Sequence, residues 1–126
     1  MTTSNNKKIL VIDDDAMNRE VMEAFLSSED YTILLAHNGE TGIQLATQAL
    51  PDAIILDVRM PDMSGYDVCE YLKKQTATQT IPIMIVTGFD SKKDIEQGQA
   101  VGADQFLSRP FDGDDLLQRV RHMVTG

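Results

Sequence analysis

Five short apolar runs alternate along the chain with longer stretches in which apolar side chains recur every three or four residues. The runs are rich in Ile, Val and Leu and occupy residues 9–12, 32–36, 53–56, 83–86 and 105–108. Continuous apolar runs of this length are typical of parallel strands that are buried on both faces. Pro51 ends the helix before the third run, and Pro82 opens the fourth, where its missing N–H does least harm.

The intervening stretches predict five amphipathic helices, including residues 42–50, 91–101 and 112–124 and a helix that begins near Gly65. The side chains expected to face the core are Met17, Val21, Met22, Phe25 and Leu26 in the first helix, Ile43, Ala46 and Leu50 in the second, Val68, Cys69 and Leu72 in the third, and Leu116, Leu117, Val120 and Val124 in the fifth. The fourth helix, from Ser91, is the weakest because Gly98 in its interior costs about 1 kcal/mol relative to alanine.

Strands that alternate with helices predict an α/β fold with a parallel sheet covered on both faces. For five strands we expect the flavodoxin-like, doubly wound (βα)5 sandwich with strand order 2-1-3-4-5. Ligands of such folds bind at the carboxyl ends of the strands. The length of 126 residues fits one domain, residues 1–126, with an ordered core of about 8–124.

Composition and charge narrow the classes of function. Hydrophobic residues make up 42% and charged residues 25%, as in folded globular domains. The net charge of −9 repels phosphate backbones and anionic lipids, so we expect neither a nucleic-acid nor a membrane partner. The single cysteine, Cys69, excludes an internal disulfide framework. We expect no secretory leader and no membrane span, and therefore a cytoplasmic domain.

Polar side chains gather where the predicted strands end: Asp13, Asp14 and Asp15 after the first run, Asp57 after the third, Thr87 after the fourth and Arg109 after the fifth. The predicted strand order brings these ends into one crevice, so several carboxylates, a hydroxyl and a guanidinium should converge there. Clustered carboxylates suit Mg²⁺, a hard cation. A carboxylate beside that cation could accept a phosphoryl group, with the arginine and the hydroxyl stabilising its oxygens.

Each of these residues also has a plainer interpretation. Aspartates that follow a strand often cap the next helix, and this is the favoured role for Asp15. Any of the others alone would be an ordinary turn or strand-end residue, so the hypothesis of a site depends on their joint placement. His37 and His122 have no partners at metal-ligand spacing, and we expect both at the surface.

The sequence resembles the receiver domains of two-component response regulators, of the kind typified by chemotaxis regulators, over nearly its whole length. The segments that carry the resemblance are Ile9–Asp14, Pro51–Gly65, Ile85–Gly88 and Phe106–Phe111, and the second is long and highly specific. The resemblance implies a phosphorelay protein in which Asp57 accepts a phosphoryl group from a histidine kinase or a histidine phosphotransfer protein. Such a domain is a phosphoacceptor rather than an enzyme, with at most self-phosphorylation and self-dephosphorylation.

The resemblance also implies a metal site. Asp14 and Asp57 would bind Mg²⁺ directly, with Mn²⁺ able to substitute, and Asp13 would bind it through water. The backbone carbonyl of Arg59 would be a further ligand.

A switch is implied in the same way. Thr87 would be its hydroxyl, and Phe106 the aromatic ring that changes rotamer with it. The change would reach a surface formed by the fourth helix, the fifth strand and the fifth helix. A downstream protein, an effector domain or a second copy of the chain would bind there.

One residue departs from the family pattern: Arg109 stands where family members normally have lysine. The charge is kept, but a planar fork replaces a compact ammonium group on a flexible stem. We expect phosphorylation to survive and its coupling to the output surface to be weaker. Arg59 could supply a second positive charge or could be a solvated loop residue.

Other functions remain open on the sequence alone. A pseudo-receiver that docks proteins without phosphorylation is favoured only by Arg109. A phosphohydrolase of the haloacid-dehalogenase type would use the pattern Asp13-x-Asp15, but it leaves Asp57 without a role. A flavin-binding flavodoxin needs Ser, Thr and Gly donors after the first strand, where this chain is acidic.

Overall fold

The computed structural model describes residues 6–88 and 92–125, which form five strands and five helices in alternation. The strands are β1 (Lys7–Ile12), β2 (Tyr31–Ala36), β3 (Ala53–Asp57), β4 (Ile83–Gly88) and β5 (Gln105–Arg109). The helices are α1 (Ala16–Leu26), α2 (Gly39–Ala49), α3 (Gly65–Lys74), α4 (Lys92–Ala100) and α5 (Gly113–Thr125). Each predicted element is present, with boundaries shifted by a few residues; Ser91, the expected start of the fourth helix, lies outside the described residues.

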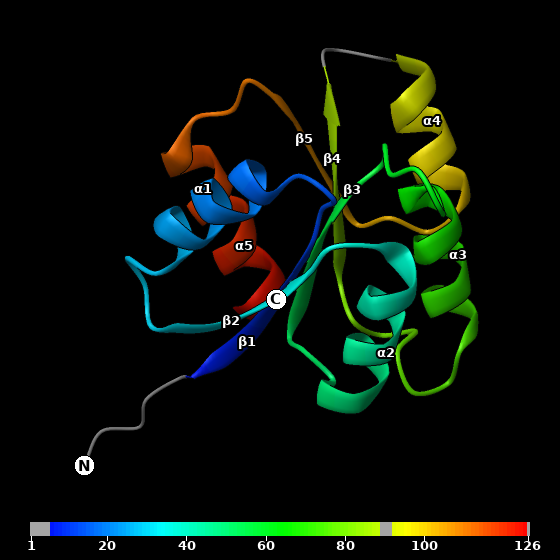
Figure 1. Ribbon diagram of the computed structural model, residues 1–126, viewed down its shortest axis with the longest axis horizontal. Helices are drawn as coiled ribbons and strands as arrows, with labels where there is room; N and C mark the ends of the chain where they lie inside the picture. Colours follow the sequence, from blue (N-terminus) through cyan, green and yellow to red (C-terminus); the bar gives the residue numbers. More distant parts are fainter. Residues whose placement is uncertain (1–5, 89–91, 126) are drawn as a thin grey trace.

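The strands form one parallel sheet in the order β2-β1-β3-β4-β5, which confirms the predicted topology. Helices α1 and α5 cover one face, and α2, α3 and α4 cover the other (Figure 1). Because all strands are parallel, their carboxyl ends lie along the same edge of the sheet. Among the helices of the described residues, none is long and apolar enough to cross a bilayer.

The sheet separates two apolar layers whose residues alternate along the strands. The layer beneath α1 and α5 includes Ile9, Val11, Ile55, Val86 and Leu107. The opposite layer, beneath α2 and α3, includes Leu10, Ile12, Ile54, Leu56 and Ile83. Burial on both faces explains why β3 and β4 and most of β1 are continuous apolar runs. The edge strands β2 and β5 differ from the prediction, because each keeps only one fully buried residue.

The buried stripe of α1 differs from the prediction. Met22 and Leu26 are buried, but Met17, Val21 and Phe25 are 71%, 41% and 38% exposed. A helix that lies on a sheet buries one stripe, and the apolar positions of α1 span a wider arc than the sheet and α5 can cover. This helix therefore presents surplus apolar side chains to solvent.

One further core position was predicted wrongly. Leu50 is 50% exposed: it follows α2 in the left-handed region, with φ 48°, and its N–H donates to the carbonyl of Ala46 at 3.0 Å. It therefore ends the helix instead of extending its buried face. In α5, Leu116 and Val120 are buried as predicted, and Leu117 and Val124 pack against the core while partly buried; Met123, which was not predicted, is also buried.

The start of α3 packs directly against the end of β3. The Gly65 N–H donates to the Val58 carbonyl at 3.1 Å, and the Ser64 hydroxyl accepts from the Asp67 N–H at 3.2 Å and caps the helix. A Cβ at position 65 would overlap the Asp57 carbonyl and lie 2.8 Å from the Val58 Cα. Glycine thus allows α3 to approach the backbone that carries Asp57.

We expect Gly65→Ala to lower the free energy of unfolding by about 2–4 kcal/mol, because backbone atoms rather than a flexible side chain oppose the added methyl group. Gly88→Ala is the matched control, since a Cβ there meets no atom of the described residues within 4 Å. Urea denaturation of both variants measures the difference, and equal stabilities would contradict the close approach.

Candidate functional site

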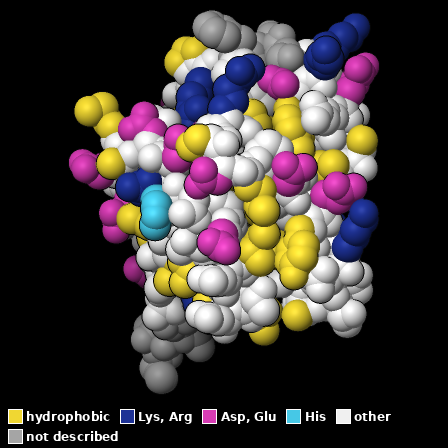
Figure 2. Space-filling model, turned by 45° about the vertical axis from the view of Figure 1, so that its right-hand side comes forward, with side chains coloured by type: hydrophobic (Ala, Val, Ile, Leu, Met, Phe, Trp, Pro, Cys, Tyr) yellow, Lys and Arg dark blue, Asp and Glu magenta, His cyan; other side chains and the backbone are white. Residues whose placement is uncertain are grey.

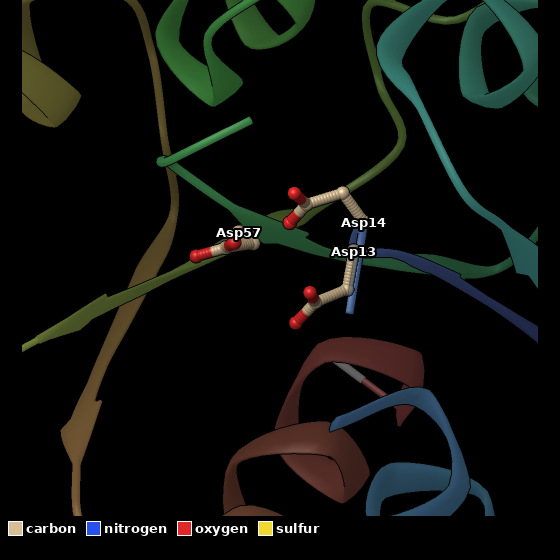
Figure 3. Close-up of side chains that lie close together, drawn as sticks. All are labelled: Asp13, Asp14 and Asp57. Carbon is tan, nitrogen blue, oxygen red and sulfur yellow. The ribbon is translucent and has the colours of Figure 1, made fainter. Parts of the chain in front are cut away.

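Three carboxylates meet at the carboxyl ends of β1 and β3. One oxygen from each of Asp13, Asp14 and Asp57 lies within 4.8 Å of the others (Figure 3). The cause is the strand register: Ile12 pairs with Leu56, so the residues that follow emerge side by side. Asp13 and Asp57 are 2% and 5% exposed, whereas Asp14 is exposed. The predicted convergence of the aspartates is confirmed.

Hydrogen bonds hold the loop after β1 in place. The Asp13 N–H donates to the Ala36 carbonyl at 3.1 Å, and the Asp13 carboxylate accepts from the Asp15 N–H at 2.9 Å. The Asp15 side chain accepts from the Met17 N–H at 2.9 Å and caps α1, as predicted. Asp15 therefore stands outside the cluster, and the pattern Asp13-x-Asp15 lacks its second reactive carboxylate.

Arg109 bridges two of the three carboxylates from the end of β5. Its Nη2 lies 2.9 Å from Asp13 Oδ2, and its Nη1 lies 3.4 Å from Asp57 Oδ1. Its side chain is 29% exposed, so water only partly screens these pairs. The guanidinium of Arg109 is thus turned toward the acidic residues. Its two partners are Asp13 and Asp57, and Asp14 is not one of them.

Thr87 lies at the end of β4 and is 1% exposed. Its neighbour Val86 pairs with Asp57 of β3, and Thr87 itself pairs with Ser108 of β5. The sheet therefore places the hydroxyl one residue along from the central carboxylate, as the strand order predicted.

Phe106 lies farther from the carboxylates, between β5 and α4. Its ring packs against a buried cluster of Val58, Tyr66 and Ile85. A Cβ on Gly98 would overlap this ring, so the ring rests against the bare backbone of α4. Gly98, which lowers the helix propensity of α4, therefore makes room for the Phe106 ring.

Arg59 contributes to the site through its backbone. Its N–H donates to the Asp57 carboxylate and lowers the pKa of that carboxyl group. The Arg59 side chain is exposed, and its charge only partly offsets the rise that burial and Asp94 cause in the pKa of Tyr66. The cation that faces Asp57 is therefore Arg109.

The carboxylates carry more negative charge than Arg109 offsets. Burial, followed by the charge of Asp13, raises the pKa of Asp57 to about 6, against its ordinary value of 3.8. Burial also raises the pKa of Asp13. Such a site favours a divalent cation, and its carboxylate oxygens are the ligands that Mg²⁺ prefers.

Sequence reasoning missed two polar residues near the site. The Asn18 side chain, in the first turn of α1, forms a hydrogen bond with Asp13 that lowers the pKa of that carboxyl group. The Tyr66 hydroxyl donates to the Asp94 carbonyl of α4 at 3.3 Å, and burial and Asp94 raise its pKa to about 12. A polar residue on the apolar stripe of α1 was the available signal for Asn18; the contact of Tyr66 depends on packing between distant segments.

The sequence matches a known family and its curated members. The family model for the response regulator receiver domain matches residues 9–121. Response regulator PleD of Caulobacter vibrioides is 41% identical over 117 residues, which cover 93% of this chain. The matched region is 26% of PleD, so this chain spans about a quarter of that relative.

Solved structures show the same fold. A structure described as a putative response regulator from Chloroflexus aurantiacus has a TM-score of 0.93 and 30% identity, and the match covers 97% of this chain and 100% of that one. The receiver domain of the sensor histidine kinase PA1611 from Pseudomonas aeruginosa has a TM-score of 0.89 and 26% identity, over 96% of this chain and 99% of that one. The latter is described with a magnesium ion coordinated in its active site cleft.

The raised pKa of Asp57 predicts a dependence of stability on pH. A carboxyl group with a pKa of about 6 when folded and 3.8 when unfolded takes up protons on folding, so its contribution to stability falls as pH rises between these values. In metal-free buffer, Asp57→Asn should therefore raise the free energy of unfolding at pH 7.5 by about 1–2 kcal/mol. The gain should shrink toward pH 4.

Urea denaturation in the presence of EDTA at several pH values tests this expectation. Asp62→Asn, an exposed position in the loop after β3, is the control and should change stability little at any pH. If the Asp57→Asn variant is less stable than the unsubstituted protein at pH 7.5, the raised pKa of Asp57 does not destabilise the fold and the prediction is wrong.

Proposed function

This chain belongs to the response regulator receiver family, and from that membership we propose that it is a phosphoacceptor module of a phosphorelay. Asp57 would receive a phosphoryl group from the phosphohistidine of a histidine kinase or histidine phosphotransfer protein in the cytoplasm. The observation that carries the proposal is the placement of Asp57: it is buried at the end of a central strand, beside two more carboxylates and 3.4 Å from Arg109.

In this reaction a carboxylate oxygen of Asp57 attacks phosphorus. The phosphorus–nitrogen bond of the donor breaks, and the imidazole leaves with the electron pair. The Arg59 N–H and the rigid end of β3 hold the carboxylate in place, which lowers the cost of orienting it. With a pKa of about 6, Asp57 is mostly ionised, and therefore nucleophilic, at neutral pH.

Asp13, Asp14 and Asp57 fit a Mg²⁺ ion, with Mn²⁺ as a substitute. Asp14 and Asp57 would bind it directly, Asp13 through water and Arg59 through its carbonyl. The bound ion would neutralise charge that develops on the phosphoryl oxygens. The magnesium ion described for the Pseudomonas aeruginosa receiver domain supports this assignment.

The signal would leave the site through Thr87 and Phe106. Thr87 would donate a hydrogen bond to a phosphoryl oxygen, and the Phe106 ring, which lies on Gly98, would pass the change to α4. A downstream protein, an effector domain or a second copy of the chain would bind the surface of α4, β5 and α5. Figure 2 turns the side of the molecule that carries α2, α3 and α4 toward the viewer and shows apolar side chains among acidic ones on that side.

One observation favours a second candidate, a pseudo-receiver that acts as a docking module without phosphorylation. Arg109 already pairs with Asp13 and Asp57, so a cationic group occupies the position where a phosphoryl group would need its counter-charge. Metal binding and phosphorylation must loosen these pairs. The guanidinium is partly exposed and can reorient, so we favour the phosphoacceptor.

Incubation with acetyl phosphate and Mg²⁺, followed by intact-protein mass spectrometry, tests the assignment. We expect a gain of one phosphoryl group, complete loss of that gain in Asp57→Asn, and retention in the control Asp62→Asn. No gain in the unsubstituted protein would support the pseudo-receiver. Release of phosphate without a stable gain would support a hydrolase.

We expect Arg109 to weaken the switch, because its pairs with Asp13 and Asp57 hold it away from the phosphoryl oxygens. In Arg109→Lys, the phosphorylation-dependent shift of the Phe106 ring resonances should be about twofold larger than in the unsubstituted protein. Arg121→Lys, which alters an ion pair with Glu29 in the turn after α1, controls for loss of a guanidinium elsewhere. Equal shifts before and after the change at position 109 would show that the arginine performs the role of the lysine.

A further inference from the structure

Helix α4 buries less of itself than the other helices of the described residues do. Gly98 is the one buried residue of α4, whereas each of the other four helices buries two or more. Asp94 and Ile95 are half-buried, and the rest of α4 is exposed. A helix with so little buried surface can shift at low cost, so the few contacts that hold it decide its position.

The C-terminal end of α4 is anchored by hydrogen bonds. The Ala103 N–H donates to the Gly98 carbonyl at 3.0 Å, and the Asp104 N–H donates to the Ile83 carbonyl of β4 at 2.8 Å. The Lys73 ammonium group of α3 contacts the Asp104 carboxylate at 2.9 Å. Movement of α4 would therefore be larger toward its other end, where Asp94 lies.

Tyr66 contacts α4 near that other end. This residue belongs to α3, which lies beside α4 (Figure 1), and its ring packs with Val58 and Ile85 in a buried cluster. Its hydroxyl donates to the Asp94 carbonyl at 3.3 Å, and the Asp94 side chain also forms a hydrogen bond with Tyr66. The distance exceeds the usual O–H···O range of about 2.5–3.0 Å, so the bond to the carbonyl has room to shorten or break as the two helices move.

The same tyrosine is joined to the backbone that carries Asp57. Its neighbour Gly65 donates an N–H to the Val58 carbonyl at 3.1 Å and lies so close to the Asp57 carbonyl that a Cβ would overlap it. The Tyr66 ring packs against Val58 itself. A displacement of the chain at Asp57 would thus reach Tyr66 by direct contact.

We propose that Tyr66 is a positioning residue that links the backbone at Asp57 to α4, as a second route beside the one through Thr87 and Phe106. The proposal rests on the function assigned to Asp57 and adds to it a path for the signal. Phe106 meets α4 at Gly98 and Tyr66 meets it at Asp94, four residues earlier and on the same face, so the two aromatic side chains set the position of the helix together.

This second route does not include Arg109. The pairs of the guanidinium with Asp13 and Asp57 would weaken the response of Thr87 and Phe106, but they leave the contacts of Val58, Gly65 and Tyr66 in place. The chain therefore has a way to move α4 that does not depend on the residue at position 109.

The first experiment tests the contact itself. Tyr66→Phe removes the hydroxyl and keeps the ring, so the fold should persist. We expect the backbone amides of α4 to exchange with solvent about fivefold faster in this variant, which is the effect of losing one hydrogen bond. Tyr71→Phe is the matched control, because Tyr71 lies on the same helix, is 47% exposed and should leave α4 unchanged. Amide hydrogen exchange followed by NMR measures both variants.

The second experiment tests the route. After treatment with acetyl phosphate and Mg²⁺, the phosphorylation-dependent shift of the α4 amide resonances should fall by about half in Tyr66→Phe, because one of two contacts that move the helix is lost. The shift of the Phe106 ring resonances and the rate of phosphoryl gain should stay unchanged. A hydroxyl that only stabilised the fold would not separate the response of α4 from that of Phe106.

Three results would overturn the proposal. Unchanged amide exchange in Tyr66→Phe would show that the hydroxyl does not hold α4. Equal effects of the two tyrosine variants would indicate a general change in α3. A loss of the Phe106 response in parallel with that of α4 would indicate one route instead of two. If acetyl phosphate fails to modify the unsubstituted protein, the phosphoacceptor function itself is wrong and the route falls with it, even where the exchange of α4 differs between the variants.

Discussion

The pairing of β1 with β3 brings together like charges that would otherwise separate. Ile12 and Leu56 are locked in register by apolar layers on both faces of the sheet, so Asp13 and Asp57 emerge side by side whether or not their charges are balanced. Core burial contributes far more free energy than two carboxylates at a rim can oppose, and the repulsion is expressed as a raised pKa of Asp57 instead of a movement of the strands. The site is thus held ready for a positive charge by forces that lie outside it.

Arg109 supplies a positive charge to this site from within the chain. It reaches Asp13 and Asp57 from β5, the strand at the far edge of the sheet, and therefore couples the edge strand to the centre. A lysine would meet the same need with one ammonium group that moves easily between partners, whereas the guanidinium fork contacts both carboxylates at once. The same residue also lines a cavity of about 420 Å³ between α1 and the connection from β5 to α5.

The strands and the acidic cluster could be predicted from the sequence because each depends on a local pattern: apolar runs define the strands, and the order of a doubly wound sheet brings their polar ends together. The exposed face of α1 was predicted wrongly, because spacing identifies an apolar stripe but not how much of it a neighbour covers. Leu50 was misplaced since its left-handed backbone conformation leaves no mark in periodicity. The edge-to-face contact between Phe25 and Phe111 joins residues that are far apart in the chain, and no sequence pattern indicated it.

The contact between Phe106 and Gly98 has a consequence for how this domain would respond to its surroundings. Charge drives the events at the carboxylates, and dissolved ions weaken them over a screening length of about 8 Å at physiological ionic strength. The ring and the bare helix backbone interact by shape alone, so ionic strength leaves that step almost untouched. Loading of the site would then depend on ionic strength, and the packing contact between Phe106 and Gly98 would not. Salt would alter how readily the site is loaded, while the proposed displacement of α4 would keep the same size.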